Sequence, residues 1–182
     1  MYEVEVKVKV PHSKMKDDLI GKGAVFSGTE EQNDTYFNSP LRDFSKTDEA
    51  LRIRSVNGAG EMTYKGKKID TVSKTRPEYN SRVDEREMKD ILSALGFFVS
   101  GAVYKRRETY LWDNLIIGFD TVEGLGEFIE VESKIRGDNG KKEIQDEIDR
   151  VFDFLSGYGI TKKDSITTSY LEMVLAAKTE VK

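Results

Sequence analysis

Residues 1–10 read Met1-Tyr2-Glu3-Val4-Glu5-Val6-Lys7-Val8-Lys9-Val10, and this stretch decides the fold. Successive side chains of a β-strand point to opposite faces, so the valines share one face and the glutamates and lysines share the other. One face is therefore apolar and the other is ionic. For a lone strand this pattern is typical of a half-exposed sheet, with valines in the core and charges in water.

Later stretches of the chain repeat this alternation of apolar and charged residues. Their charged members are Arg52 and Arg54, Lys65, Lys105 and Arg107, and Glu130 and Glu132. Pairs of carboxylates thus occur in the first and last strands of the series, and the cations come from the strands between them. The stretch 74–83 alternates less regularly, and Pro77 predicts that it lies near a sheet edge or a bulge.

Turn signals between the strands predict an antiparallel sheet, and two stretches predict helices that cover it. Residues 84–95 begin with Asp84 as N-cap and with Glu87 completing a capping box, and Gly96 ends the helix. Its apolar stripe consists of Met88, Ile91, Leu92 and Leu95. A second stripe consists of Ile144, Ile148, Val151, Phe152 and Leu155. We expect an α+β fold, mainly β, and leave the closing segment 169–175 open between strand and helix.

The recurring ionic face leaves two interpretations open from the residues alone. In a sandwich the charges would lie in water, whereas in a closed barrel with helices outside they would line the interior. Such an interior needs ligands, because clustered carboxylates repel one another unless they share protons or bind a hard divalent cation. Clustered lysines and arginines need an anion for the same reason. A polyphosphate that carries Mg²⁺ or Mn²⁺ would satisfy both groups.

Composition limits the class of protein. With 182 residues the chain can bury a sizeable core, and we expect a single domain over residues 1–182. The 29 lysines and arginines against 33 aspartates and glutamates give a net charge of -4, which argues against a general nucleic-acid binder. The absence of cysteine excludes disulfides and thiolate metal sites. No signal peptide or membrane-spanning run is recognisable, so we expect a cytoplasmic protein without membrane partners.

Together these motifs resemble the CYTH domain of the triphosphate tunnel metalloenzymes, a family that includes class IV adenylyl cyclases, thiamine triphosphatases and inorganic triphosphatases. Its hallmark, Glu-x-Glu-x-Lys, is matched by Glu3, Glu5 and Lys7. The later matches, in order, are Leu51-Arg52-Ile53-Arg54, Thr63-Tyr64-Lys65, Lys105-Arg106-Arg107, Asp120, Gly124-Leu125-Gly126, Glu130-Val131-Glu132 and Ser169-Tyr170-Leu171-Glu172. The resemblance covers essentially the whole chain. It implies a closed antiparallel barrel of about eight strands, with an internal tunnel and helices outside.

The resemblance also implies roles for individual residues. The metal-binding carboxylates would be Glu3, Glu5, Glu130 and Glu132, with Mg²⁺ or Mn²⁺ as the cofactor. The triphosphate-binding cations would be Lys7, Arg52, Arg54, Lys65, Lys105 and Arg107. The catalytic residues would be Glu3, Glu5, Lys7 and Asp120, of which Asp120 would bind metal or orient a cation. Arg76 and Glu78 match charged tunnel positions less closely, and Arg106 is expected on the surface.

The implied enzyme promotes attack on a phosphorus of a bound triphosphate, such as ATP, tripolyphosphate or thiamine triphosphate. Length and strand motifs look closest to class IV adenylyl cyclases, which convert ATP to cyclic AMP and pyrophosphate. A triphosphatase is the alternative, because Met1-Tyr2 precedes Glu3 where characterised bacterial cyclases carry His-Phe. A non-catalytic polyphosphate-binding module is a third hypothesis. The sequence permits a homodimer, and it leaves open whether loop 39–48 is a lid.

Overall fold

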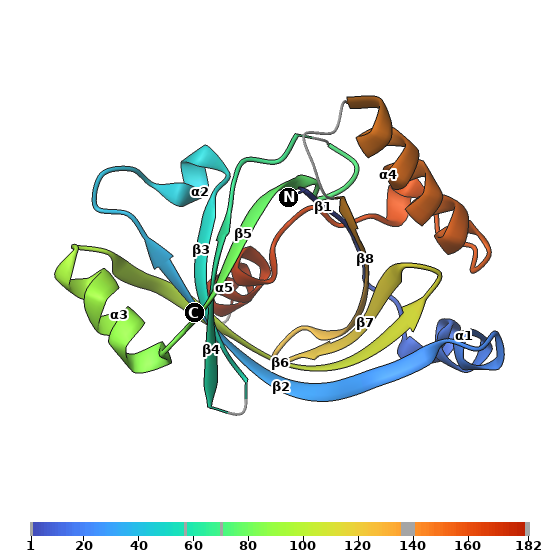
Figure 1. Cartoon of the computed structure of the whole chain (residues 1–182), viewed down its shortest axis with the longest axis horizontal. Coiled ribbons are helices and arrows are strands. Elements are labelled where there is room, and N and C mark those ends of the chain that lie inside the picture. Colours follow the sequence, from blue (N-terminus) through green and yellow to red (C-terminus); the bar gives the residue numbers. More distant parts are fainter. Residues whose placement is uncertain (1, 57, 70, 136–140, 181–182) are drawn as a thin grey trace.

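The computed structural model describes residues 2–56, 58–69, 71–135 and 141–180. Its strands are β1 (Tyr2–Val8), β2 (Val25–Asn38), β3 (Ala50–Val56), β4 (Ala59–Lys65), β5 (Arg76–Val83), β6 (Phe98–Trp112), β7 (Leu115–Val122) and β8 (Gly126–Ile135). They form a closed antiparallel barrel in the order β1-β5-β4-β3-β2-β6-β7-β8, seen as a ring in Figure 1. The predicted barrel of about eight strands is confirmed.

The barrel closes unevenly on the two sides of β1. Its pairing with β8 runs along the whole strand and places Glu5 opposite Glu132 and Lys7 opposite Glu130. Its pairing with β5 is short, with Glu3 opposite Arg76 at the start of that strand. Pro77 lies in this short seam, where a missing backbone N–H costs little. The closing register thus brings the predicted carboxylate pairs of the first and last strands side by side.

Alternation along β1 separates the outer core from the interior, as the sequence predicts. Val4, Val6 and Val8 are buried in a cluster outside the barrel wall. That cluster also contains the predicted stripe of α4 (Lys141–Ser156), which consists of Ile144, Ile148, Val151, Phe152 and Leu155. Figure 1 shows α4 at the right, outside the ring beside β1 and β8. With the valines packed outward, the charged residues of β1 face inward.

The helix predicted over residues 84–95 is present as α3 (Glu85–Ala94), with Asp84 as its N-cap. The Asp84 carboxylate accepts a hydrogen bond from the backbone N–H of Glu87 at 2.9 Å. The predicted apolar stripe is wrong in part, because Ile91 and Leu95 are exposed and only Met88 and Leu92 contact the outer face of the sheet. The helix contacts β3 and β4, and this contact leaves one side of the stripe in solvent.

The segment that the sequence left open is helical. It forms α5 (Tyr170–Glu180), whose first residues pack against the interior side chains Val103, Val122 and Phe128. Figure 1 shows α5 within the outline of the ring, unlike the helices α1 (Lys16–Gly21), α2 (Phe44–Thr47), α3 and α4 around it. Two short 3₁₀ turns, His12–Lys14 and Lys162–Asp164, complete the elements of the described residues. The start of α5 therefore contributes to the barrel interior.

The segment 39–48, a candidate lid, is tied to its surroundings. Within it, α2 is capped by Asp43, and Phe44 is buried. Asp48 at its end accepts hydrogen bonds from the backbone N–H of Lys68 at 2.9 Å and from the ammonium group of the same residue at 2.6 Å. Arg42 binds Glu49 through two hydrogen bonds, at 2.8 and 2.7 Å. These contacts favour a fixed connection over a free lid.

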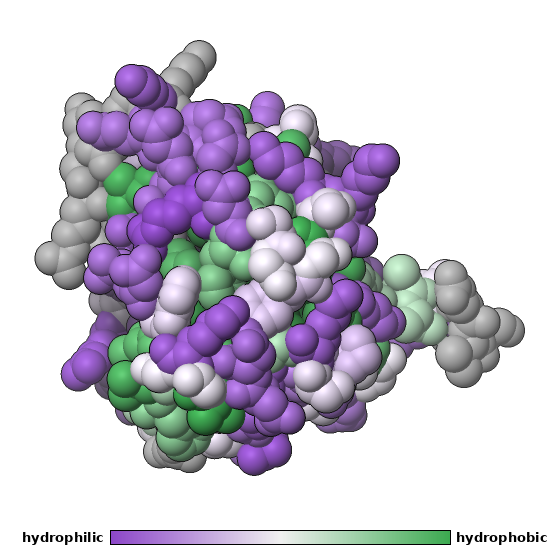
Figure 2. Space-filling view, turned by 90° about the vertical axis from the view of Figure 1, so that its right-hand side faces the viewer, coloured by the Kyte–Doolittle hydropathy of each residue, from purple (hydrophilic) through white to green (hydrophobic). Residues whose placement is uncertain are grey.

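Charged and polar side chains cover most of the face that Figure 2 shows, with hydrophobic side chains gathered at the lower left. The exposed apolar residues of the described chain include Val25 and Leu111, which are register partners on β2 and β6. The predicted homodimer stays a prediction. Among the described residues, every helix is too short or too polar to cross a membrane.

Candidate functional site

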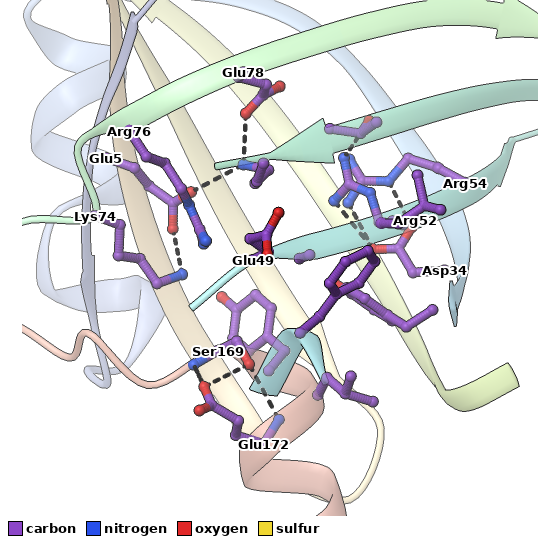
Figure 3. Close-up of a pocket in the computed structure, with 18 of the residues that line it drawn as sticks. Glu5, Asp34, Glu49, Arg52, Arg54, Lys74, Arg76, Glu78, Ser169 and Glu172 are labelled. Carbon is purple, nitrogen blue, oxygen red and sulfur yellow. Dashed lines mark hydrogen bonds and ion pairs between the residues drawn. The ribbon is translucent and has the colours of Figure 1, made fainter. Parts of the chain in front are cut away.

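The barrel encloses a cavity of about 510 Å³, and its lining combines carboxylates and cations. Charged side chains enter it from β1, β2, β3, β4, β5, β6 and β8. Figure 3 shows Glu5, Lys74 and Arg76 on one side of this cavity and Asp34, Arg52 and Arg54 on the other. The ionic faces that the sequence repeats thus meet in one enclosed space.

Three of the predicted metal ligands lie together. Glu3, Glu5 and Glu132 each offer a carboxylate oxygen, and these oxygens lie within 4.8 Å of one another. Burial, together with the neighbouring carboxylates, raises the pKa of Glu3 and of Glu132 above the ordinary value. A hard divalent cation that takes oxygen ligands fits this donor set and would relieve the repulsion within it.

The fourth predicted ligand, Glu130, lies among three cations, one of which, Arg107, also pairs with Glu132 at 2.8 Å. Its carboxylate forms a short ion pair with Arg107, and the ammonium groups of Lys105 and Lys74 lie 3.8 and 3.9 Å away. Although burial acts to raise it, these cations hold the pKa of Glu130 well below its ordinary value. Glu130 therefore lies on the cationic side of the site, and its role as a metal ligand stays a prediction.

Asp34 holds the two arginines of β3. Its carboxylate accepts hydrogen bonds from Arg54 at 2.7 and 2.8 Å and from Arg52 at 3.4 Å. Burial acts to raise the pKa of Asp34, but the two guanidinium groups outweigh it and hold the pKa far below its usual range. The guanidinium of Arg52 also donates to Thr63 at 3.2 Å. Arg52 and Arg54 therefore form a fixed cationic edge of the cavity, and their role in binding a triphosphate stays a prediction.

Lys65 and Lys74 are each paired with a predicted metal ligand. The ammonium group of Lys65 lies 2.6 Å from Glu3 and 2.7 Å from Glu78. Lys74 lies 2.7 Å from Glu5. Electrostatic attraction to these carboxylates raises the pKa of both lysines, despite the opposing effect of burial. Both therefore carry a positive charge at neutral pH, and both would need new partners if the glutamates bound a metal ion.

Arg76 differs from the other cations that line the cavity. Its side chain is only 6% exposed, and its Nε atom has no hydrogen-bond partner. In the described part of the chain, no carboxylate forms an ion pair with Arg76, whereas its neighbour Glu78 is paired with Lys65. A buried and unpaired guanidinium in a cavity indicates a site for an anion.

Two residues with a predicted catalytic role are fully buried behind the cavity lining. Asp120 accepts hydrogen bonds from Lys105 at 2.7 Å and from Arg107 at 2.6 and 2.7 Å, so it orients cations. Lys7 donates a short hydrogen bond to the backbone carbonyl of Thr168 and lies over the ring of Tyr170. Burial and the nearby charge of Lys74 lower the pKa of Lys7 to about 6. A direct role of either residue in catalysis stays a prediction.

Sequence reasoning missed three residues of this site, Asp34, Lys74 and Tyr170. Lys74, Arg76 and Glu78 occupy alternate positions, so their side chains are expected on the same face. This alternation could have identified Lys74, although it precedes the first residue of β5. The polar run before Asp34 does not alternate, so nothing marked its inward direction. Arg106, predicted on the surface, is confirmed there, with its side chain 54% exposed.

Comparisons with known proteins agree with this geometry. The CYTH domain family matches residues 1–170. A Methanocaldococcus jannaschii protein named "putative adenylate cyclase" is 41% identical over 175 residues, which are 95% of this chain and 98% of that protein. The PH1819 protein of Pyrococcus horikoshii OT3 has a TM-score of 0.83 at 37% identity, and the match covers 96% of this chain and 98% of that one. HpAC1 from Hippeastrum, described as a "putative adenylyl cyclase" with a dominant triphosphatase activity, shares the fold with a TM-score of 0.62 at 19% identity, over 87% and 88% of the two chains.

Proposed function

Because this chain belongs to the CYTH domain family, we propose that it is a metal-dependent enzyme that acts on a triphosphate bound inside the barrel. One observation carries the proposal: the carboxylates of Glu3, Glu5 and Glu132 face buried cations across a single cavity. Each half of this arrangement matches one half of a metal–triphosphate complex. A barrel that served only as a scaffold would gain nothing from so many buried charges.

Glu3, Glu5 and Glu132 would hold the metal ion, and the fit rests on their oxygens lying within 4.8 Å of one another. Oxygen ligands of this kind suit Mg²⁺ or Mn²⁺. When bound, the ion would offset phosphate charge and polarise a phosphoryl oxygen.

The chain's own cations would bind and orient the phosphates. Arg76 can accept a phosphate without losing an ion pair, because it has none among the described residues. Lys65 and Lys74 would turn from their glutamates toward phosphate oxygens once those carboxylates had another cation. Arg52 and Arg54, fixed by Asp34, would present a rigid edge against which the substrate is aligned. Charge that develops on the phosphates would be stabilised by these fixed groups.

Among the reactions open to this site, we assign cyclisation of ATP first, because the relative at 41% identity bears the name of an adenylate cyclase. In that reaction the ribose 3′-hydroxyl oxygen bonds to the α-phosphorus, and pyrophosphate leaves. The second candidate is hydrolysis, in which water attacks and a phosphate or diphosphate leaves. The description of the Hippeastrum protein favours this candidate. Both reactions use the same binding groups.

A product assay tests the proposal. The purified protein is given Mg²⁺ or Mn²⁺ and, separately, ATP, tripolyphosphate or thiamine triphosphate, and cyclic AMP, pyrophosphate and phosphate are measured. Cyclic AMP with an equal amount of pyrophosphate would establish the cyclase. Phosphate without cyclic AMP would establish a triphosphatase. Saturable binding of a triphosphate without any turnover would replace both with a binding module.

A further inference from the structure

Tyr170 places an aromatic ring inside the barrel, although it belongs to a helix. It is the first residue of α5, and the start of this helix is fixed by Ser169 and Glu172. The Glu172 carboxylate accepts hydrogen bonds from the backbone N–H and the hydroxyl of Ser169, both at 2.7 Å, and Figure 3 shows this pair at the edge of the cavity. The ring is buried and meets Phe128 edge-on, with 5.1 Å between the centroids. Its position is therefore well defined.

The side-chain amino groups of three lysines lie around this ring. The Nζ atoms of Lys7, Lys105 and Lys74 lie 4.1, 4.9 and 5.9 Å from the ring centroid. A cation within about 6 Å of an aromatic face is attracted by the negative charge of the π-system, and the attraction grows where water is excluded. Lys74 and Lys105 also line the cavity, so the ring lies directly against its cationic wall.

Lys7 depends on the segment that carries Tyr170 more than the other two lysines do. Lys74 and Lys105 have carboxylate partners in Glu5 and Asp120, at 2.7 Å each. No carboxylate of the described residues forms an ion pair with Lys7. Its side-chain amino group instead donates to the backbone carbonyl of Thr168, and its own carbonyl accepts from the N–H of Ile166 at 2.8 Å. Residues 166–170 thus hold both the backbone and the side-chain nitrogen of Lys7.

The hydroxyl of Tyr170 links the ring to a buried carboxylate. It donates a hydrogen bond to Asp120 at 3.0 Å. Asp120 is the carboxylate that also binds Lys105 and Arg107. The ring of Tyr170 therefore contacts three lysines. Its hydroxyl contacts Asp120, the aspartate that binds two cations.

We propose that Tyr170 is a positioning residue, whose ring contacts the side-chain amino groups of Lys7, Lys74 and Lys105 and thereby holds Lys74 and Lys105 in the cationic wall that receives the phosphates. The part of this proposal that concerns phosphate binding rests on the proposed function. The contacts between Tyr170 and the three lysines do not depend on that function. The simpler interpretation is that Tyr170 only fills the apolar cluster with Val103, Val122 and Phe128. Under that interpretation any apolar side chain of similar size would serve.

The test compares Tyr170→Phe, which keeps the ring, with Tyr170→Leu, which removes it. Tyr110→Leu is the matched control, because Tyr110 is equally buried, at 6% exposure, in the cluster outside the barrel wall. NMR relaxation measures the order parameter of the Lys7 ε-methylene group, which reports how firmly this side chain is held, and calorimetry measures the affinity for the non-hydrolysable bis(methylene)triphosphonate with Mg²⁺. Thermal melting shows that each variant is folded.

We expect Tyr170→Phe to keep the order parameter of the Lys7 ε-methylene group and most of the affinity, and Tyr170→Leu to lower the order parameter and to weaken binding about tenfold. The Tyr110→Leu control should change neither. A folded Tyr170→Leu variant with unchanged affinity, or with an unchanged Lys7 order parameter, would overturn the proposal. If the wild type binds no triphosphonate, the proposed function fails, and the order parameters still decide whether Tyr170 positions Lys7.

Discussion

The ammonium nitrogen of Lys74 lies 2.7 Å from Oε1 of Glu5, so a cation of the cavity wall neutralises a carboxylate of the proposed metal site. Lys65 and Glu3 repeat this relationship at 2.6 Å. In the absence of ligands, the two halves of the site therefore satisfy each other. A metal ion that took the carboxylates would free the lysines for phosphate, and this exchange couples the two binding events.

The first prediction concerns this coupling. Mg²⁺ should increase the affinity for bis(methylene)triphosphonate at least about tenfold, a coupling free energy of about 1.4 kcal/mol, because Lys65 and Lys74 become available. Isothermal titration with and without Mg²⁺ measures it. In Glu5→Gln, Lys74 loses its nearest carboxylate partner even without metal, so affinity without metal should rise and the effect of Mg²⁺ should shrink. An equal effect of Mg²⁺ in the two proteins would contradict the exchange.

The second prediction separates Glu5 from Glu130. Glu5→Gln should abolish Mn²⁺ binding, followed by electron paramagnetic resonance, with little loss of stability. Glu130→Gln should lower the free energy of unfolding by about 1–3 kcal/mol, because buried Arg107, Lys105 and Lys74 lose a shared charged partner. Both variants should lose turnover. Normal turnover in Glu5→Gln would remove Glu5 from the metal site.

The third prediction uses the unpaired charge of Arg76. Arg76→Met should weaken triphosphonate binding by about 1.5–3 kcal/mol, the range for hydrogen bonds to charged groups. The same change should leave the stability of the free protein equal or higher, because an unpaired buried charge is removed. Calorimetry and urea unfolding measure the two quantities. Arg54→Met is the control, since it deprives Asp34 of a bidentate partner and should cost about 1–3 kcal/mol of stability. Unchanged affinity in Arg76→Met would place this residue outside the phosphate site.

The fourth prediction concerns pH. The pKa of Asp34 is lowered in the folded protein by Arg52 and Arg54, so this carboxylate stabilises the fold at pH values above its unfolded pKa of about 3.9. That contribution should be lost as the pH falls from about 5 toward the folded pKa. Urea unfolding at successive pH values should therefore show a shallower acid decline in Asp34→Asn than in the wild type. Parallel declines would show that Asp34 is not held by the arginines.

Alternation on β1 predicted two distinct faces, and the structure buries Val4 and Val6 on one side and Glu3 and Glu5 on the other. The residues alone left a sandwich and a barrel open, and the barrel was predicted from the resemblance to the CYTH domain. Alternation alone could not predict that Glu130 and Glu132 have different ion-pair partners, because both side chains point inward. Their partners depend on the positions of Lys105 and Arg107. The apolar stripe predicted for α3 was wrong in part. The spacing of apolar residues identifies one face of a helix, but it does not show how much of that face the sheet covers.

Tyr170 was quoted as part of a family motif, but its role could not be read from the sequence. Its ring enters the barrel only because residues 166–168 dock on Lys7 and α5 begins at that point. This is a tertiary arrangement, and no local pattern encodes it.

The most direct test of metal-dependent triphosphate binding inside the barrel is a crystal structure with Mn²⁺ and bis(methylene)triphosphonate, recorded with anomalous scattering from manganese. We predict an anomalous peak within bonding distance of Glu3, Glu5 and Glu132, and phosphonate oxygens against Arg76, Lys65 and Lys74. Manganese or phosphonate found only outside the barrel, with Lys74 still paired to Glu5, would contradict the account.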